Sequence, residues 1–389
     1  MSDSLEHFAR DKLADLEARH LRRTLIETDR TGPARAVRGP RRLISFSCND
    51  YLNLTTDPFT KRRAVDAVVQ FGVGAGASRL VTGNGPLYEE LEAKLADLKG
   101  TEDAIVFGSG YLANISIAPT LVGVRDMVLI DELAHACLYA GARLSRARLF
   151  SFRHNDLAHV EELLKRFRSH HERAMILTDG VFSMDGDIAP LPGLAALAED
   201  YDAWLMSDDA HGIGVVGEGR GSSFAFDPVP DVPLQMGTLS KAIGSYGGYL
   251  CASRAVTDLM RTRARGFIYT TGLPPAALAA ASAALDVIAT EPDRVALPVE
   301  NARYFSAALD LPDPQSPIVP LIVGAPEAAM GLSRALEEAG FLVNAYRPPT
   351  VPEGTSRLRF AFSAAHRRSD IDRLLQVLVP LLRRTRDIA

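Results

Sequence analysis

The sequence has only three cysteines, and Cys48, Cys137 and Cys251 lie far apart along the chain. They form neither a CxxC pair nor a cluster with histidines at the spacing of a zinc site. A disulfide-stabilised secreted domain is therefore not indicated, and we expect no bound metal. Unpaired thiols are typical of proteins in a reducing compartment, so we predict a cytoplasmic location.

A long hydrophobic run is also missing. Residues 1–30 are highly charged and lack the apolar core of a secretory signal. The most apolar stretch, Ala276 to Ala289, is about 14 residues long and contains Ser282 and Asp286, so it is too short and too polar to span a bilayer. We predict a buried helix there and no membrane partner.

Neither sign of charge dominates the chain. It has 43 basic and 48 acidic residues and a net charge of −5, and the basic residues are spread along its length. This distribution argues against a dedicated nucleic-acid-binding protein. The sequence also lacks the GxGxxG and GxxxxGK[ST] fingerprints, which disfavours a nicotinamide enzyme and a P-loop enzyme.

Apolar runs and amphipathic helical stretches alternate from residue 100 to about residue 290, which is typical of an α/β fold with a mostly parallel sheet. Before them, Ser4 to Leu25 has the pattern of an amphipathic helix that packs on a larger unit. Prolines follow residue 290, and further strands and helices come after them. We predict an N-terminal helical arm (1–45), a large α/β domain (46–290) and a smaller C-terminal α+β domain (291–389). The expected strands of the large domain are 104–107, 127–130, 148–152, 174–178, 203–207 and 249–252.

One lysine differs from the others in its surroundings. The chain has six lysines, and five lie among charged residues that indicate solvated helix faces or turns. Lys241 lies in a glycine-rich segment without another charge from Gln235 to Ser253. An isolated cation of this kind suits imine chemistry at a lowered pKa, although a lysine that reaches solvent from a loop has the same pattern.

Polar residues follow three of the expected strands. Asp208 and His211 come after the strand that ends at residue 207, and an aspartate there could be a metal ligand, a helix cap or the partner of a pyridine nitrogen. His135 follows another strand, where it could stack on a cofactor ring or be a structural histidine. Ser109-Gly110-Tyr111 lies between a strand and a helix, the usual place for a phosphate.

In this order, the motifs resemble the α-oxoamine synthases, which are fold-type-I enzymes dependent on pyridoxal 5′-phosphate (PLP). The resemblance covers nearly the whole chain. The matching segments are 47–52, 74–79, 109–111, 135–136, 179–187, 208–212, 237–241, 269–271, 347–352 and 357–359.

The resemblance implies a large domain with a mostly parallel seven-stranded sheet, a smaller C-terminal domain, and a homodimer with shared active sites. It also implies a role for each matched residue in cofactor binding and catalysis. Lys241 would form the Schiff base, Asp208 would hold the pyridinium nitrogen, and His135 would stack on the ring. The other implied cofactor contacts are His211 and Ser183 at the phenolic oxygen, Ser109, Gly110, Tyr111 and Thr238 around the cofactor and its phosphate, and Thr271 at the phosphate of the neighbouring subunit.

By the same resemblance, Arg359 would bind the carboxylate of the amino acid, and Asn49 would lie near the reacting centre. Arg22 and Thr350 would contact the acyl substrate, and Arg347 would be a further carboxylate contact. Members of this family condense an amino acid with an acyl thioester and release carbon dioxide.

The segment from Arg347 to Thr350 favours the branch of the family that uses L-alanine and pimeloyl-CoA or a pimeloyl carrier protein in biotin synthesis. Glycine C-acetyltransferase, 5-aminolevulinate synthase and serine palmitoyltransferase activities stay open as alternatives, because these enzymes share the cofactor site. A catalytically silent PLP-binding chain is an alternative of a different class.

Overall fold

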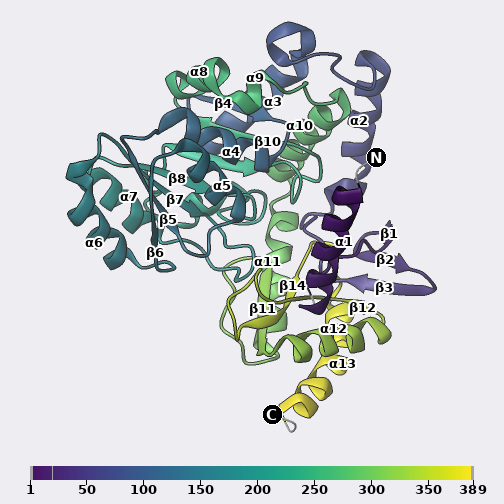
Figure 1. Ribbon diagram of the computed structural model, residues 1–389. Coiled ribbons are helices and arrows are strands. Elements are labelled where there is room, and N and C mark those ends of the chain that lie inside the picture. The colour runs from purple at the N-terminus through teal and green to yellow at the C-terminus, as the bar shows by residue number, and fades with distance from the viewer. Residues whose placement is uncertain (1–2, 20, 387–389) are drawn as a thin grey trace.

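The computed structural model describes residues 3–19 and 21–386, and only the backbone of residues 384–386 (Figure 1). Three groups of elements follow one another along the chain: an N-terminal helix with a small sheet, a large α/β unit, and a C-terminal unit that packs against the small sheet. No helix within the described ranges is long and apolar enough to cross a membrane.

The N-terminal segment is helical only in its first part. Helix α1 (Asp3–Ala18) is followed by three antiparallel strands, β1 (Asp29–Gly32), β2 (Arg35–Arg38) and β3 (Arg41–Ser45). Strand β3 pairs in parallel with β12 (Phe341–Leu342) from the C-terminal unit. The helical arm expected over residues 1–45 is thus wrong for residues 29–45, because these residues complete a sheet with the C-terminal unit.

Helix α1 has no buried residue. Leu5 is 72% exposed and Phe8 is 59% exposed, so the apolar face that the sequence predicts has no partner within the described part of this chain. The expected packing of this helix on a larger unit is therefore not seen in the single chain. In the view of Figure 1, α1 lies beside the N-terminal strands and in front of the C-terminal unit.

The large unit contains a seven-stranded sheet in the order β4-β10-β9-β8-β7-β5-β6. All neighbouring strands from β9 to β6 are parallel, and β10 is antiparallel to both of its neighbours. The mostly parallel sheet is confirmed. The strands are β4 (Asp103–Phe107), β5 (Met127–Asp131), β6 (Arg148–Phe152), β7 (Ala174–Asp179), β8 (Trp204–Asp208), β9 (Leu234–Thr238) and β10 (Gly248–Ala252).

Helices cover both faces of this sheet, which explains why its central strands are apolar at consecutive positions. Alternate residues of β5 illustrate this, since Val128 and Ile130 belong to one buried cluster while Met127 and Leu129 belong to another. One face is covered by α4 (Gly110–Leu121), α5 (Ala136–Ser145), α8 (Arg254–Arg263) and α9 (Arg265–Ile268). The other face is covered by α3 (Pro86–Lys99), α6 (Leu157–Phe167), α7 (Leu191–Asp200) and α10 (Pro275–Thr290).

Helix α10 is the buried helix expected from the alanine-rich stretch, and it packs against α2 (Pro58–Phe71) and α3. Helix α11 (Pro292–Ala307) then leads into the C-terminal unit. Its antiparallel sheet has the order β11-β14-β13, and its core includes Phe305, Phe360 and, from the N-terminal segment, Phe46. The elements are β11 (Ile318–Gly324), α12 (Pro326–Glu338), β13 (Asn344–Tyr346), β14 (Ser356–Ala361) and α13 (Arg368–Arg386). The domain boundaries at residues 45 and 290 stay a prediction.

Candidate active site

A cavity of about 250 Å³ opens at the carboxyl edge of the large sheet. Parallel strands all end on the same edge, so the last residues of β7, β8 and β9 come together there. Most of the cofactor residues expected from the sequence line this one cavity. Its lining comprises Ser109, Gly110, Tyr111, Asn114, His135, Cys137, Asp179, Val181, Ser183, Asp208, Ala210, His211, Met236, Thr238, Ser240 and Lys241.

The first turn of α4 forms one end of the cavity. Ser109 caps this helix by accepting a hydrogen bond from the Leu112 backbone N–H at 3.1 Å. A Cβ atom on Gly110 would lie 3.2 Å from Cβ of Thr238, so glycine allows α4 to approach β9 closely. Backbone N–H groups of a helix N-terminus, together with the Thr238 hydroxyl nearby, suit the phosphate of the expected cofactor.

Asp208 is buried at the end of β8, and it is held by two hydrogen-bond donors. The Ala210 backbone N–H donates to its Oδ1 at 3.0 Å, and the Asn114 side chain donates to its Oδ2 at 2.6 Å. The neighbouring Asp179 is also buried, and burial together with the Asp208 charge raises its pKa well above the ordinary value. Two buried carboxyl groups thus lie on neighbouring strands at this edge of the sheet.

Each of the two histidines of the cavity uses Nδ1 for a hydrogen bond within the protein and, among the described residues, has Nε2 free. Nδ1 of His211 lies 2.7 Å from the Tyr51 hydroxyl. Burial holds the pKa of His211 well below its usual range and raises that of Tyr51, so the phenol donates to a neutral imidazole and leaves Nε2–H as the free donor. His135 caps α5 through Nδ1, which accepts from the Cys137 backbone N–H at 3.3 Å. Its ring is exposed at the mouth of the cavity, where one face of a flat cofactor is expected.

Lys241 is partly buried on the wall of the cavity. Desolvation lowers the pKa of its ammonium group, and the carboxylates of Asp208 and Asp179 oppose that shift. A lowered pKa favours the deprotonated amine that imine formation needs.

A second lysine contradicts the expectation from the sequence. Lys99 was expected on a solvated helix face, yet its ammonium group is fully buried and lies 2.7 Å from Oδ2 of Asp209. Its local sequence is charged, but it is the last residue of α3 and its side chain enters the core beneath the turn that carries Asp208. This ion pair fixes the turn from below, and it leaves Lys241 as the lysine that faces the cavity.

Arg359 is the most informative of the expected substrate contacts. Its side chain is 1% exposed, on the central strand β14 of the C-terminal sheet. Its three hydrogen-bond acceptors are the Ser183 carbonyl at 2.5 Å, Asn49 Oδ1 at 3.2 Å and the Tyr51 hydroxyl at 3.3 Å, and all three are uncharged. No carboxylate forms an ion pair with it within the described residues, whereas Arg357 on the same strand pairs with Asp185. A buried guanidinium without a counter-ion is prepared for a carboxylate ligand.

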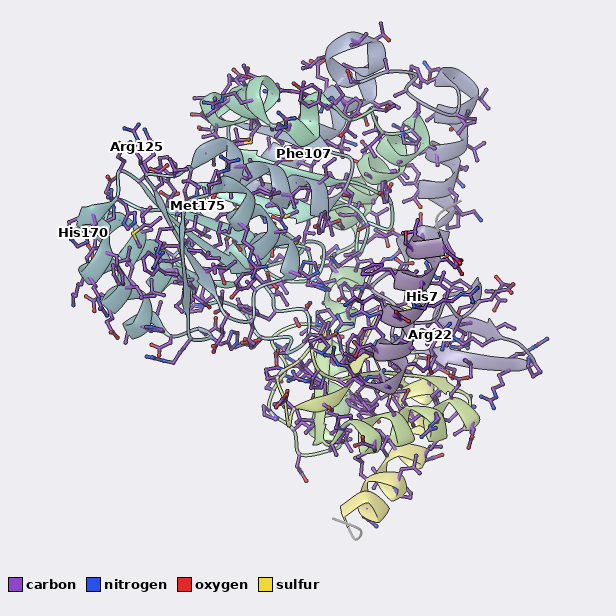
Figure 2. All side chains as sticks on the ribbon, in the orientation of Figure 1. His7, Arg22, Phe107, Arg125, His170 and Met175 are labelled. Atoms are coloured by element: carbon purple, nitrogen blue, oxygen red, sulfur yellow. The ribbon has the colours of Figure 1, made fainter. Side chains whose placement is uncertain are left out.

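The remaining expected contacts are not brought into this cavity. Thr271 is exposed and bridges to Ser78, and Thr350 is exposed in the turn after Arg347. Arg22 is exposed and pairs with Glu17 at 3.1 Å. Figure 2 shows Arg22 beside the N-terminal strands, well apart from Phe107 and Met175 of the large sheet. The roles of these residues stay predictions.

Four residues of the site were not found from the sequence as functional residues: Tyr51, Asn114, Cys137 and Asp179. Tyr51 and Asp179 lie inside matched motifs, so the motifs themselves were the available signal. Asn114 and Cys137 lie on the apolar helices α4 and α5, where only their polar character could have marked them.

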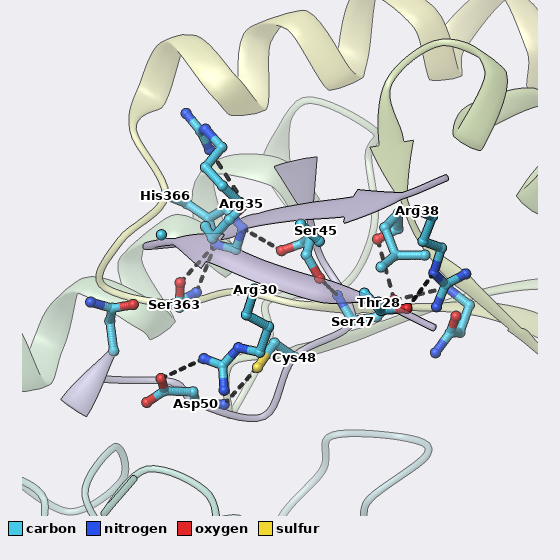
Figure 3. A pocket seen from close by; sticks show the side chains of 16 residues that line it. Thr28, Arg30, Arg35, Arg38, Ser45, Ser47, Cys48, Asp50, Ser363 and His366 are labelled. Atoms are coloured by element: carbon cyan, nitrogen blue, oxygen red, sulfur yellow. Dashed lines mark hydrogen bonds and ion pairs between the residues drawn. The ribbon is translucent and has the colours of Figure 1, made fainter. Parts of the chain in front are cut away.

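A second cavity of about 200 Å³ lies between the N-terminal strands and the C-terminal unit (Figure 3). It contains Arg30, Arg35 and Arg38, but each arginine is matched by an acid, namely Asp50, Asp370 and Glu337 respectively. Since these pairs join β1–β3 to the rest of the molecule and consume the arginine charges, we interpret this cavity as part of a structural junction.

Comparison with known proteins agrees with the geometry. Residues 41–378 match the family model of class I and II aminotransferases. The 8-amino-7-oxononanoate synthase of Beijerinckia indica is 60% identical over 98% of both chains, and that of Methylocella silvestris is 64% identical over 88% of this chain and 97% of the relative. The solved structure of Sphingomonas wittichii serine palmitoyltransferase superposes with a TM-score of 0.91 at 30% identity, over 98% of both chains.

PLP fits the cavity, since a phosphate cradle, a buried carboxylate, a facing imidazole and a lysine of lowered pKa are arranged around it. The α/β fold with a seven-stranded, mostly parallel sheet agrees with the solved relative. The chain therefore belongs to the class I and II aminotransferase family and, within it, to the PLP-dependent 8-amino-7-oxononanoate synthases.

Proposed function

We propose that this chain condenses L-alanine with a pimeloyl thioester, with loss of carbon dioxide, to give 8-amino-7-oxononanoate for biotin synthesis. The observation that carries the proposal is the buried, uncompensated guanidinium of Arg359 beside the cofactor cavity. It offers a place for the amino-acid carboxylate, and the names of relatives at 60% and 64% identity supply the reaction.

Bound PLP supplies an electron sink for the bonds at Cα of the amino acid. Asp208 would hold the proton of the ring nitrogen, because its carboxylate is buried and oriented by two donors. Arg359 orients the substrate carboxylate, and Lys241 Nζ, with its lowered pKa, accepts the Cα proton. His211, whose Nδ1 is occupied by the Tyr51 hydroxyl, would donate from Nε2 to the phenolic oxygen of the cofactor, together with Ser183.

The acyl substrate would be bound outside the cofactor cavity. A pimeloyl chain ends in a carboxylate, and the arginines expected near it are Arg22 and Arg347, with Thr350 next to the latter. Arg22 is half-exposed on a surface ion pair, which solvent weakens, so a substrate carboxylate can compete with Glu17 for it. Either CoA or a carrier protein would suit this arrangement, because the carrier is attached at the thioester end, opposite to the carboxylate that these residues would bind.

A second copy of the chain would complete the site. Thr271, expected at the cofactor phosphate, does not line the cavity of its own chain. Apolar side chains are exposed on α2 and on the glycine-rich segment that follows it, and Thr271 bridges to this same segment. These are Val65 (61% exposed), Val69 (83%), Val73 (83%) and Val81 (73%). A homodimer with shared active sites accounts for both observations, and we place the enzyme in the cytoplasm, where its free cysteines would stay reduced.

A substrate matrix tests the proposal. The purified holoenzyme is assayed with L-alanine, glycine and L-serine, each against acetyl-, hexanoyl-, palmitoyl- and pimeloyl-CoA. We expect the highest kcat/KM for L-alanine with pimeloyl-CoA. A higher kcat/KM for glycine with acetyl-CoA would instead assign a glycine C-acetyltransferase activity. A higher kcat/KM for L-serine with palmitoyl-CoA would assign a serine palmitoyltransferase activity, and this is the second candidate because the solved relative is a serine palmitoyltransferase. If the protein binds PLP but turns over none of these substrate pairs, the result would favour the alternative of a catalytically silent PLP-binding chain.

A further inference from the structure

A continuous chain of polar contacts along the wall of the cofactor cavity joins the residue expected at the ring nitrogen to the residue expected on the ring face. Asp208 Oδ2 lies 2.6 Å from Nδ2 of Asn114. The same Nδ2 lies 3.0 Å from Sγ of Cys137, and this sulfur lies 2.6 Å from Nδ1 of His135. Asn114 is 2% exposed, Cys137 is 3% exposed and Asp208 is 5% exposed.

Close packing of two helices brings these groups together. Asn114 lies on α4 and Cys137 lies on α5, which are neighbours on the same face of the sheet. A Cβ atom on Gly141 of α5 would lie only 2.3 Å from the Asn114 carbonyl oxygen. The missing side chain at Gly141 therefore lets α5 approach α4 closely enough for the amide to reach the sulfur.

The chemistry of the groups fixes the direction of every hydrogen bond. A carboxylate only accepts, so the side-chain amide of Asn114 must present its NH₂ group to Asp208. The second hydrogen of that group points to the sulfur of Cys137. The thiol stays protonated, because burial and the Asp208 charge raise its pKa to about 12. Its hydrogen is then donated to Nδ1 of His135.

His135 consequently has no hydrogen on Nδ1. The Cys137 backbone N–H also donates to this nitrogen, at 3.3 Å. Desolvation lowers the pKa of His135, so the ring is neutral and its single N–H is on Nε2. Two donors on one side thus select the tautomer whose N–H is directed away from α5.

We propose that Asn114 and Cys137 are positioning residues that hold the Asp208 carboxylate in one orientation and select the Nε2–H tautomer of His135. The proposal rests on the proposed function for the roles of Asp208 and His135. It adds two residues on α4 and α5 to the residues that prepare the site, and it couples the ring-nitrogen partner to the residue on the ring face.

The test combines four variants of the full-length holoenzyme. Cys137→Ala removes the thiol donor, Cys137→Ser replaces it with a hydroxyl donor, and Asn114→Leu removes the amide at similar volume. Cys251→Ala is the matched control, because Cys251 is an equally buried thiol on β10 outside the network. For each variant we would measure the ¹⁵N shifts of labelled histidine, assigned with His135→Gln, and the kinetics with L-alanine.

We expect the wild-type protein and the Cys251→Ala variant to have the Nε2–H tautomer of His135, and Cys137→Ala to have a mixture of both tautomers. Cys137→Ser should restore the single tautomer. Asn114→Leu should lower kcat by about 10- to 100-fold, with the KM for L-alanine changed by less than about twofold, as for other groups that orient a reacting residue.

An unchanged tautomer in Cys137→Ala, a mixture that Cys137→Ser does not correct, or wild-type kcat in Asn114→Leu would overturn the proposal. The tautomer is read without any acyl substrate. A protein with the expected tautomers but no condensation activity would therefore contradict the proposed function and leave the proposal about Cys137 standing.

Discussion

The residues expected in the active site form two regions, which differ in whether their side chains come together within a single chain. Those around the cofactor, such as Asp208, His211 and Lys241, converge on one cavity at the carboxyl edge of the large sheet. Those expected at the acyl substrate and at the partner's phosphate, such as Arg22, Thr350 and Thr271, stay on the outside of the same chain. The inner region is organised by one chain, whereas Arg22, Thr350 and Thr271 are exposed and do not line its cavity.

The two regions differ in the physical means by which they hold their side chains. Inner residues are held by buried hydrogen bonds, as Asp208 is by Asn114 and Ala210. In the outer region, Arg22 has one solvent-exposed ion pair. Buried networks fix one geometry, and exposed pairs contribute little. We propose that most of the cofactor site is prepared within each chain and that a second copy completes it with Thr271.

The largest effect should follow from Lys241→Ala in the inner region. This variant loses the amine that attaches the cofactor and accepts the Cα proton, so we expect turnover to fall by about 10⁴-fold or more. Borohydride reduction of the wild-type holoenzyme followed by peptide mapping should place the label on Lys241. Lys165→Ala on the exposed face of α6 is the control and should retain wild-type activity. A label on any other lysine would refute the assignment.

A smaller loss of activity is expected when Arg359, the residue of the inner region that would bind the substrate carboxylate, is changed. Arg359→Lys keeps the charge but loses the planar, two-donor geometry, so the KM for L-alanine should rise by about 10- to 100-fold. The KM for the acyl thioester should stay within about twofold. Arg357→Lys is the control on the same strand, because Arg357 already has an acidic partner in Asp185. Equal effects of the two substitutions on the alanine KM would show that Arg359 has no special role.

Changes in the outer region should be milder and should affect the other substrate. Arg22→Ala should raise the KM for the pimeloyl thioester by about three- to tenfold and leave the KM for L-alanine unchanged, since an exposed charge pair is worth about 1 kcal/mol. Arg23→Ala is the control at the neighbouring position. If Arg22→Ala changed the alanine KM instead, the separation of the two regions would be wrong.

The smallest effect should be on thermal stability, and it concerns His154 at the rim of the inner region. His154 bridges Asp131 at 3.1 Å and Asp187 at 2.8 Å, and these carboxylates raise its pKa to about 10 despite opposing burial. A raised pKa means that the stabilisation is complete below the ordinary value near 6.5 and is lost as the pH rises through about 10. We expect the Tm of the wild-type protein to fall between pH 8 and pH 10.5.

The His154→Gln variant lacks the charge that pairs with the two aspartates, so its Tm at pH 7 should be lower than that of the wild-type protein. Because glutamine does not titrate, the Tm of the variant should also decline less over the same alkaline range. His159→Gln on α6 is the control, because the His159 side chain accepts from the Arg153 backbone N–H and does not join the two aspartates. A Tm of the His154→Gln variant that declines as steeply as that of the wild-type protein would exclude His154 as the source of the alkaline loss.

Most residues that the sequence suggested for the inner region line one cavity, because they follow strands or lie in motifs of fixed order. Strand β9 was missed, since Leu234–Thr238 includes a glutamine and a glycine and lacks a continuous apolar run. Lys99 was misjudged because its neighbours along the chain are charged, while its partner Asp209 is distant in sequence. Local patterns could not reveal long-range pairs of this kind.

The same limit applies at the N-terminus and on the helices of the site. Residues 29–45 were expected to belong to a helical arm, but their partner strand β12 follows about 300 residues later, and pairing over such distances leaves no local signal. Asn114 and Cys137 occupy apolar helices, and only the close approach of α4 and α5 at Gly141 gives them a polar role.

The separation of the two regions is tested most directly by combining one defect from each in a mixed dimer. Lys241→Ala disables the inner region, and Thr271→Glu places a carboxylate where the partner's phosphate is expected. Coexpression with two different tags allows the heterodimer to be purified. If Thr271 serves the site of the other copy, one of the two sites in the heterodimer is fully wild-type, because its lysine and its threonine come from unaltered positions.

We therefore predict that the heterodimer regains about half of the wild-type specific activity, because one of its two sites is intact, although each parent homodimer is nearly inactive at limiting PLP. If Thr271 acted within its own chain, every site would contain at least one defect. A heterodimer with no more activity than the Thr271→Glu parent would contradict the shared active site.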